Sequence, residues 1–304
     1  MRWGIGRMSA AIDPGLYAVG SPYTNSPVLV SANYRLTFDT LRKNLAGLDC
    51  WILILDTKGI NVWCAAGKGT FGTEELIYRI EEVGLAGVVQ HRKLILPQLG
   101  APGVDSHEVA RRSGFSVKFG PVRAADIKQY ITDSYKVTPT MRTVKFTTRD
   151  RLVLTPMEFI PAARYSLAVL GVLFLLNLVA VRPFGALDLV LYLGAIIVGA
   201  VITPVLLPII PGRAFSWKGW LLGLIWTACA LWFFGWLAPQ SWLLAAGYLL
   251  LLPALSAFLA MNFTGASTYT SPTGVLREMR IALPLILVSS SGGAILLLIK
   301  TFMG

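Results

Sequence analysis

Long apolar runs in the second half constrain this 304-residue chain more than any other feature. From Tyr165 to the C-terminus there are only six basic and two acidic residues, whereas the whole chain has 27 Lys and Arg and 16 Asp and Glu. A helix that crosses a bilayer core needs about 20 mostly apolar residues. Five segments are therefore predicted to span a membrane: residues 165–181, 187–210, 217–238, 242–263 and 281–302.

This uneven distribution of charge divides the chain into two predicted domains. Charged residues make up 14% of the chain, whereas a soluble domain has about 25%, so an entirely soluble protein is excluded. Disorder is excluded as well, because 55% of the residues are hydrophobic and can bury a core. We predict a cytoplasmic domain at residues 1–157 and an all-α transmembrane domain of five helices at residues 158–304.

The basic residues between the spans predict the orientation in the membrane. If the N-terminal domain lies inside, the outer loops and tail carry only Arg182 and Lys300, and the inner loops carry four basic residues. Positive charge favours the cytoplasmic side, so we expect a multi-pass protein of the cytoplasmic membrane with its C-terminus outside. The first 20 residues lack the apolar core of a signal peptide. The four inner basic residues are Arg213, Lys218, Arg277 and Arg280.

The pattern of the first half indicates alternating buried strands and amphipathic helices. It predicts an α/β Rossmann-like domain with a largely parallel sheet. Strands are expected at residues 27–31, 51–55, 88–89, 93–96 and 115–119, and a hairpin at residues 141–155. Ligands of such sheets bind beyond the carboxyl ends of the strands. The loops expected at that edge are residues 31–35, 56–73, 97–103 and 120–122.

The loop at residues 59–73 contains the most informative residues. Its glycines fit neither a phosphate-binding loop nor a dinucleotide fingerprint, because the spacing is wrong and Lys68 is followed by Gly69. We instead expect Asn61 to cap a short helix that has Cys64 in its first turn, where the helix dipole favours a thiolate. Such a thiolate is a good metal ligand or nucleophile. The alternative is that Cys64 is a small buried hydrophobe.

Residues 61–68, N-V-W-C-A-A-G-K, resemble the cap-helix motif of the corrinoid protein of microbial mercury methylation, the HgcA family. Residues 31–37, 56–59, 96–103 and 120–122 are similar to loops of the corrinoid iron–sulfur proteins of acetyl-CoA synthesis. The Thr- and Ser-rich segment at residues 261–271 also resembles a loop of the HgcA family.

The resemblance implies a cobalamin or related corrinoid at the carboxyl edge, with the Cys64 thiolate as lower axial ligand of cobalt and the cofactor's own base displaced. A thiolate increases electron density on a metal, which would help to release a methyl group to electrophilic Hg(II) and form methylmercury. Small residues would let the backbone approach the ring. The residues expected to bind the cofactor are Thr57, Asn61, Val62, Trp63, Cys64, Ala65, Gly100, Ala101, Gly120 and Pro121.

The same resemblance implies partners. They are a ferredoxin-like protein with 4Fe–4S clusters that supplies electrons and delivers Hg(II), a methyl donor protein or folate, and the lipid bilayer. The scattered Lys and Arg give no sign of nucleic-acid binding.

Alternative functions stay open. They are a membrane-anchored corrinoid methyl carrier of acetyl-CoA or folate one-carbon metabolism, and a transporter, which the lack of charge deep in the spans disfavours. His107, in a segment similar to the D-x-H-x-x-G motif of other cobalamin enzymes, is an alternative cobalt ligand.

Overall fold

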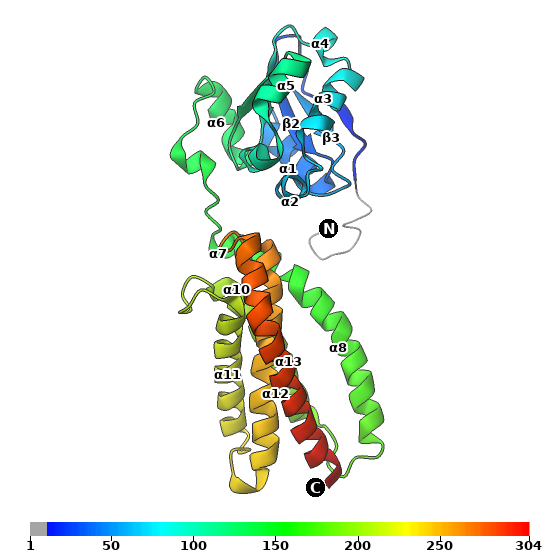
Figure 1. Ribbon diagram of the computed structural model, residues 1–304, viewed down its shortest axis with the longest axis vertical. Helices are drawn as coiled ribbons and strands as arrows, with labels where there is room; N and C mark the ends of the chain where they lie inside the picture. Colours follow the sequence, from blue (N-terminus) through cyan, green and yellow to red (C-terminus); the bar gives the residue numbers. More distant parts are fainter. Residues whose placement is uncertain (1–10, 304) are drawn as a thin grey trace. The chain divides into compact units, whose positions relative to one another are not determined.

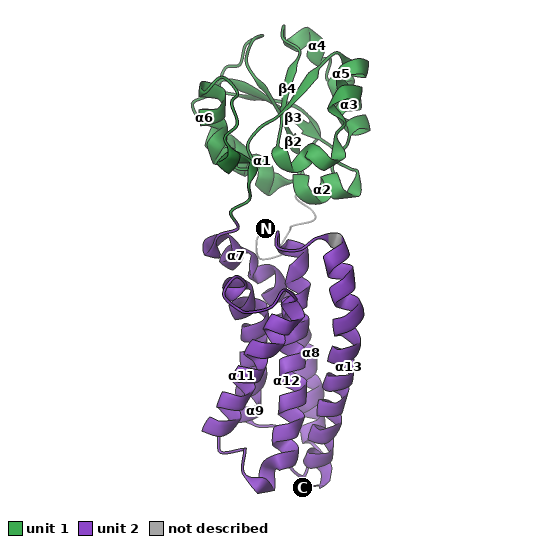
Figure 2. Cartoon of the chain, turned by 60° about the vertical axis from the view of Figure 1, so that its left-hand side comes forward, with its two compact units in different colours: residues 1, 6–145 green, residues 2–5, 146–304 purple. Residues whose placement is uncertain are grey.

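The computed structural model describes residues 11–303, and these divide into two compact units. The first, an α/β unit, ends at Lys145, and the second, a helical unit, begins at Phe146 (Figure 2). A short helix, α7 (Thr148–Leu154), therefore groups with the apolar helices that follow it. This grouping rests on contacts within the chain, so the predicted change from cytoplasmic to membrane domain at residue 157 stays a prediction.

A five-stranded sheet forms the centre of the α/β unit, in the order β1-β3-β2-β4-β5. Four strands are parallel, as the sequence predicts, and β1 pairs with β3 in the antiparallel direction. The inner strands β2 and β3 read V-L-V-S-A and C-W-I-L-I-L, and such continuous apolar runs are typical of strands covered on both faces. The strand bounds are β1 (Gly15–Val19), β2 (Val28–Ala32), β3 (Cys50–Leu55), β4 (Lys93–Leu96) and β5 (Ser116–Phe119).

Each face of the sheet has its own core. On one face Phe38 and Leu41 of α1 and Tyr130 of α6 pack with Leu29 and Ile52. The opposite face packs against α2 to α5, which lie on the other side of the strands in Figure 2. The helix bounds are α1 (Arg35–Leu45), α2 (Val62–Lys68), α3 (Thr73–Glu82), α4 (Leu85–Val88), α5 (Ser106–Ser113) and α6 (Ile127–Thr132), with short 3₁₀ segments η1 (Gln98–Gly103), η2 (Ala124–Asp126) and η3 (Pro139–Arg142).

No strand forms at residues 88–89, because Val88 is the last residue of α4. The hairpin expected at residues 141–155 is not formed either. The segment instead contains the end of η3 and the helix α7. A capping box explains the helix, because the Thr147 hydroxyl accepts from the Asp150 backbone N–H at 3.3 Å while the Asp150 carboxylate accepts from the Thr147 N–H at 2.8 Å.

Long apolar helices make up the helical unit (Figure 1). Small residues let them approach closely: a Cβ atom at Gly223 of α11 would lie 2.7 Å from Ser256 Cβ of α12, and one at Gly293 of α13 would lie 2.7 Å from the Gly247 oxygen of α12. The elements are α8 (Pro156–Asn177), α9 (Ala186–Ile197), a π-helical turn (Val198–Ile202), α10 (Thr203–Leu206), α11 (Phe215–Phe233), α12 (Trp242–Asn262) and α13 (Pro272–Met303), with 3₁₀ turns at Pro239–Ser241 and Phe263–Ala266.

Within the described residues, four helical segments are long and apolar enough to cross a membrane, and the predicted five spans are not confirmed. The segment that falls short is α11, which has 19 residues. Its mean hydropathy is lowered by Lys218 and by four tryptophans. The four qualifying segments are Thr148–Asn177, Ala186–Leu206, Pro239–Ala266 and Thr273–Met303.

Candidate active site at the carboxyl edge of the sheet

The loops that follow β2, β3, β4 and β5 meet at one edge of the sheet because these strands run parallel. The loop after β3 continues into α2, which packs against η1 of the loop after β4. The segments that the sequence singled out thus lie at the same edge. This convergence makes the edge the candidate site.

Asn33, directly after β2, holds the loop after β3 in place. Its side chain is 4% exposed. Its Oδ1 accepts hydrogen bonds from the backbone N–H groups of Thr57 at 3.1 Å and Gly59 at 2.9 Å, and its Nδ2 donates to Asp56 Oδ1 at 3.2 Å. Buried backbone groups need such partners. The place of this loop at the site was predicted from the sequence, but the role of Asn33 was not.

Thr57 is fully buried, and its hydroxyl lies 2.9 Å from Asn33 Oδ1 and 2.7 Å from the Ile60 carbonyl oxygen. Next to it, Lys58 has φ +58°, a left-handed conformation that is strained for a residue with a side chain. The Lys58 ammonium and backbone N–H both bond to the Asp56 carboxylate, and these hydrogen bonds lower the pKa of Asp56 below its ordinary value. Internal bonds therefore fix the whole turn that leads to α2.

The expected short helix and its cap are confirmed. Asn61 has an extended backbone, with φ −66° and ψ 160°, and its Oδ1 accepts from the Cys64 backbone N–H at 3.0 Å. Cys64 lies in the first turn of α2, where unpaired N–H groups and the helix dipole favour negative charge. Lys68 ends the helix, one turn further along.

One face of α2 is buried and the other is open. Val62, Ala65 and Ala66 belong to the core of the α/β unit, whereas the Trp63 ring is 40% exposed and Cys64 is partly exposed. The alternative considered for Cys64, that it is a small buried hydrophobe, describes Cys50 instead, because Cys50 is fully buried. Burial, with Asp49 nearby, raises the pKa of the Cys50 thiol to about 11. The accessible thiol of the site is thus Cys64.

The small residues of the edge make room for the protein's own side chains. A Cβ atom at Gly100 would lie 2.5 Å from the Phe71 ring, and one at Gly120 would lie 3.0 Å from Ile95 Cγ2. Phe71 is fully buried. Phe71 was not predicted from the sequence, where its only signal is that it is a single aromatic residue among glycines. Contacts of Gly100, Ala101, Gly120 and Pro121 with a cofactor stay predictions.

Gln98, at the start of η1, carries a buried acceptor. Its Oε1 has no hydrogen-bond partner among the described residues. A buried polar atom without a partner costs about 1–3 kcal/mol, and an N–H donor of a bound group would remove that cost. A corrinoid has such donors in the amide groups around its ring. The partly exposed thiol, the capped helix and this acceptor fit the cofactor that the resemblance implies.

His107 lies in the first turn of α5 and is exposed. Its backbone N–H donates to Asp105 Oδ1 at 2.9 Å, so the segment forms an ordinary capped helix start. Over the described residues, no group of three or more His, Cys, Asp or Glu could hold a metal ion.

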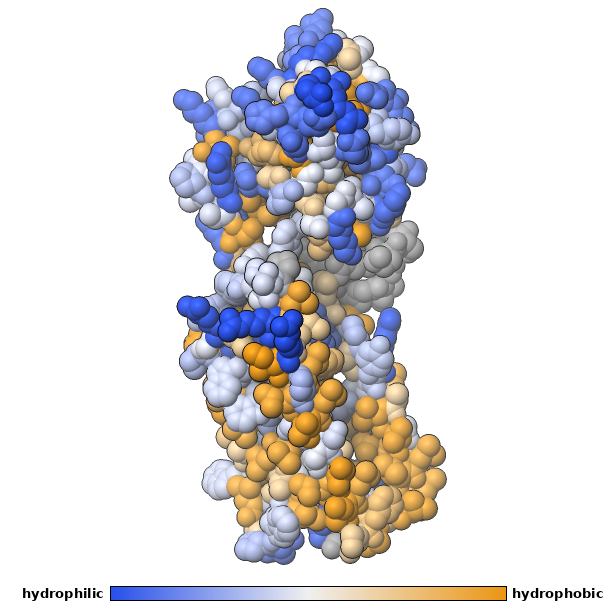
Figure 3. All heavy atoms as spheres, viewed as in Figure 1, coloured by the Kyte–Doolittle hydropathy of each residue, from blue (hydrophilic) through white to orange (hydrophobic). Residues whose placement is uncertain are grey.

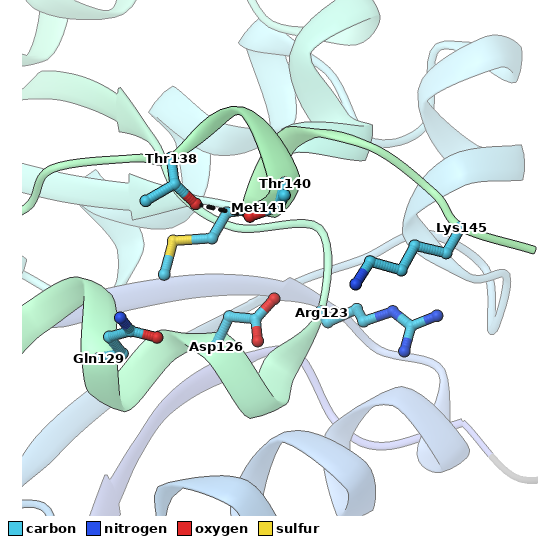
Figure 4. A pocket seen from close by; sticks show the side chains of 7 residues that line it. All are labelled: Arg123, Asp126, Gln129, Thr138, Thr140, Met141 and Lys145. Atoms are coloured by element: carbon cyan, nitrogen blue, oxygen red, sulfur yellow. Dashed lines mark hydrogen bonds between the residues drawn. The ribbon is translucent and has the colours of Figure 1, made fainter.

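A polar pocket of about 250 Å³ lies beside the loop that follows β5 (Figure 4). The Val122 N–H donates to the Met141 carbonyl oxygen at 2.8 Å and ties η3 to this loop. The Thr138 and Thr140 hydroxyl oxygens lie 2.9 Å apart. No lining residue was predicted from the sequence. They are Arg123, Asp126, Gln129, Thr138, Thr140, Met141 and Lys145.

Residues 6–131 match a family model described as the CO dehydrogenase/acetyl-CoA synthase delta subunit. The chain is also similar to acetyl-CoA decarbonylase/synthase complex subunits gamma. It is 34% identical to that of Methanopyrus kandleri over 122 residues, 40% of this chain and 26% of the relative. It is 31% identical to that of Methanocaldococcus jannaschii over 131 residues, 42% of this chain and 26% of the relative. The α/β unit is related to these acetyl-CoA proteins.

This similarity ends before the helical unit, and the chain spans about a quarter of the length of these relatives. The matched region contains β1 to β5 and the whole carboxyl edge with Asn33, Cys64 and Gln98. The relation to the acetyl-CoA proteins is therefore a relation of the candidate site. The matched relatives are acetyl-CoA proteins, so their similarity gives no support to mercury methylation.

Proposed function

We propose that this chain is a membrane-anchored corrinoid protein that carries a methyl group in one-carbon metabolism. One observation carries the proposal: Cys64 is a partly exposed thiol in the first turn of a capped helix, at the carboxyl edge of an α/β unit related to the acetyl-CoA decarbonylase/synthase subunits. The gamma subunits belong by name to a complex of acetyl-CoA chemistry, in which a one-carbon group is transferred.

When bound, the corrinoid supplies a cobalt centre that can accept and release a methyl group. The chain would hold it through Cys64 Sγ as the lower axial ligand, with Trp63 beside it and Gln98 Oε1 accepting from an amide of the ring. Asn61 fixes the first turn of α2 and with it the position of Cys64. Asn33 holds the preceding turn and so positions the whole cap.

The helical unit would be the anchor. Four of its segments have the length and apolar composition of membrane spans. The basic residues at one end of these helices, such as Arg213 and Arg280, support a cytoplasmic α/β unit, by the charge bias of inner loops. Partners of this proposal are a methyl donor, either a protein or a folate, and an electron donor such as a ferredoxin-like protein with 4Fe–4S clusters.

Transfer of the methyl group to Hg(II) is a second candidate function. It is favoured by the residues of α2 itself, because N-V-W-C-A-A-G-K would offer the bound cobalt a thiolate, a strong donor. A thiolate ligand increases electron density on its metal, and a methyl group released with its electrons suits an electrophile such as Hg(II). The comparisons favour the carrier, since the relatives belong to acetyl-CoA complexes.

The test is an anaerobic absorption spectrum of the full chain reconstituted with cobalamin. Wild type is expected to bind it with its own base displaced, and Cys64→Ala is expected to lose the thiolate signature. Cys229→Ala, in α11, is the matched control and should behave as wild type. Absence of bound corrinoid in wild type would overturn the proposal. Methyl transfer from the loaded protein to a folate or to Hg(II) then separates the two functions.

A further inference from the structure

A large groove crosses the helical unit between α8, α9, α12 and α13. Its volume is about 870 Å³, and its walls are almost entirely aliphatic and aromatic side chains, such as Leu173, Leu251 and Leu298. Apolar side chains also cover much of the surface of this unit in Figure 3. Water in this groove would have few hydrogen-bond partners, so its binding there is unfavourable. The groove therefore suits a hydrocarbon chain.

Polar contacts at two places on α8 keep the groove open between them. The Ser166 hydroxyl oxygen lies 2.9 Å from the Tyr192 hydroxyl oxygen of α9. At the C-terminal end of α8, the Asn177 side chain donates to the Phe184 carbonyl oxygen at 2.9 Å and accepts from the Phe184 N–H at 2.8 Å. Only 11% of the most apolar stretch of the Thr148–Asn177 segment is buried. Fixed at both places, α8 leaves a space that the protein itself does not fill.

One end of the groove is charged. Asp188 and Tyr248 line it, and Asp188 is 6% exposed. Asp188 Oδ1 accepts from Arg182 Nη2 at 3.0 Å and from the Tyr248 hydroxyl at 2.5 Å, while Oδ2 accepts from the Gly185 N–H at 2.7 Å. Both carboxylate oxygens of Asp188 thus accept hydrogen bonds from the protein. The Arg182 guanidinium, in contrast, still has a nitrogen that donates no hydrogen bond to a described residue.

Arg182 Nη1 is buried and has no hydrogen-bond partner among the described residues. The guanidinium carbon lies 5.2 Å from the centre of the Trp236 ring, which holds the group in place without accepting all its N–H bonds. An arginine fork matches the oxygens of a phosphate. Arginine and tryptophan together are also typical of the level at which lipid headgroups lie.

We propose that this groove binds one phospholipid, with its acyl chains between α8 and the α12–α13 pair and its anionic headgroup beside Arg182, whose guanidinium pairs with Asp188 at the charged end of the groove. The apolar walls favour acyl chains over water, and the positively charged Arg182, which has an N–H donor without a partner among the described residues, favours an anionic headgroup. The site rests on the membrane anchoring proposed above and is independent of the corrinoid. Bound lipid would hold α8, the helix that follows the α/β unit, against the rest of the bundle.

The test uses the delipidated full chain in detergent and native mass spectrometry. Phosphatidylglycerol is expected to be retained as a single bound lipid, and diacylglycerol with the same chains is expected to be retained about tenfold less, the value of one charge-assisted hydrogen bond. Equal retention of both would overturn the headgroup assignment. A protein that is dimeric and binds no lipid would overturn the whole proposal.

Two variants test the groove itself. Arg182→Gln combined with Asp188→Asn removes both charges, so that no buried carboxylate is left unpaired, and is expected to weaken phosphatidylglycerol retention about tenfold. Ala294→Trp fills the groove and should abolish retention. Arg213→Gln, at an exposed arginine, is the matched control and should retain the lipid.

Undiminished retention in both groove variants would overturn the site. The cobalamin spectrum of the same variants separates this proposal from the proposed function, because it should equal that of wild type. Loss of the spectrum with lipid retained would count against the corrinoid site alone.

Discussion

The backbone N–H of Cys64 donates to Asn61 Oδ1 at 3.0 Å, so that one side chain both begins α2 and sets the position of the thiol. Asn61→Ala removes this cap and is expected to destabilise α2 by about 1 kcal/mol and to weaken cobalamin retention. Asn61→Ser, which can still cap, should preserve both. The measurement is the cobalamin dissociation constant of each purified variant. Equal affinity of the alanine variant and wild type would contradict a positioning role of the cap.

Asn33 is expected to matter as much as the residues of the cap. Asn33→Leu removes the acceptor for the Thr57 and Gly59 N–H groups and leaves them buried without a partner. The expected loss is about 2 kcal/mol in the free energy of unfolding of the α/β unit, measured by denaturant titration with tryptophan fluorescence. Asn44→Ala on α1, where the exposed side chain donates to the Thr40 carbonyl oxygen, is the control and should change it by less than about 0.5 kcal/mol.

How far the sequence predicts this fold depends on whether the deciding contacts are local. The buried runs of β2 and β3 and the cap of α2 are written in neighbouring residues, and all three were predicted. β1 was missed because its apolar run, L-Y-A-V, is short and lies on an edge strand that has no fully buried residue. The roles of Asn33 and Phe71 depend on residues from other loops, such as Gly59 and Gly100, which only the folded chain brings close.

The number of membrane spans was also not fully predictable from local sequence. Residues 217–238 were predicted to be a span because they contain few charges, yet Lys218 and the four tryptophans of α11 leave it less apolar than its neighbours. Its close packing on α12 through Gly219 and Gly223 is a tertiary feature that hydropathy does not contain.

Gly100 tests whether the small residues of the edge serve internal packing. Gly100→Ala would place a methyl group 2.5 Å from the Phe71 ring, and such overpacking is expected to cost about 1–3 kcal/mol in the free energy of unfolding. Gly67→Ala on α2, where a Cβ atom meets nothing within 4 Å, should be neutral or slightly stabilising. Phe71→Leu added to Gly100→Ala should recover part of the loss. No recovery would show that the methyl group clashes elsewhere.

The Asp56–Lys58 pair predicts a pH dependence of the loop. The hydrogen bond from Lys58 lowers the folded-state pKa of Asp56 below its unfolded value of about 3.9. The carboxylate therefore stabilises the fold fully above that pH, and this contribution is lost as the pH falls through the folded pKa. Asp56→Asn should flatten the decline in the free energy of unfolding below about pH 4, measured by denaturant titrations at several acidic pH values. A decline as steep as that of wild type would contradict the assignment.

The two cysteines of the α/β unit are expected to differ sharply in reactivity. Cys50 is fully buried and its thiol pKa is raised to about 11, whereas Cys64 is partly exposed in the first turn of α2. Because the thiolate is the nucleophile, iodoacetamide at neutral pH should label Cys64 and leave Cys50 unmodified in the folded protein. Peptide mass spectrometry measures both sites, with the denatured protein as the control in which both react. Prior loading with cobalamin should protect Cys64, and labelling of Cys64 at an unchanged rate in protein shown to carry cobalamin would contradict its role as the cobalt ligand.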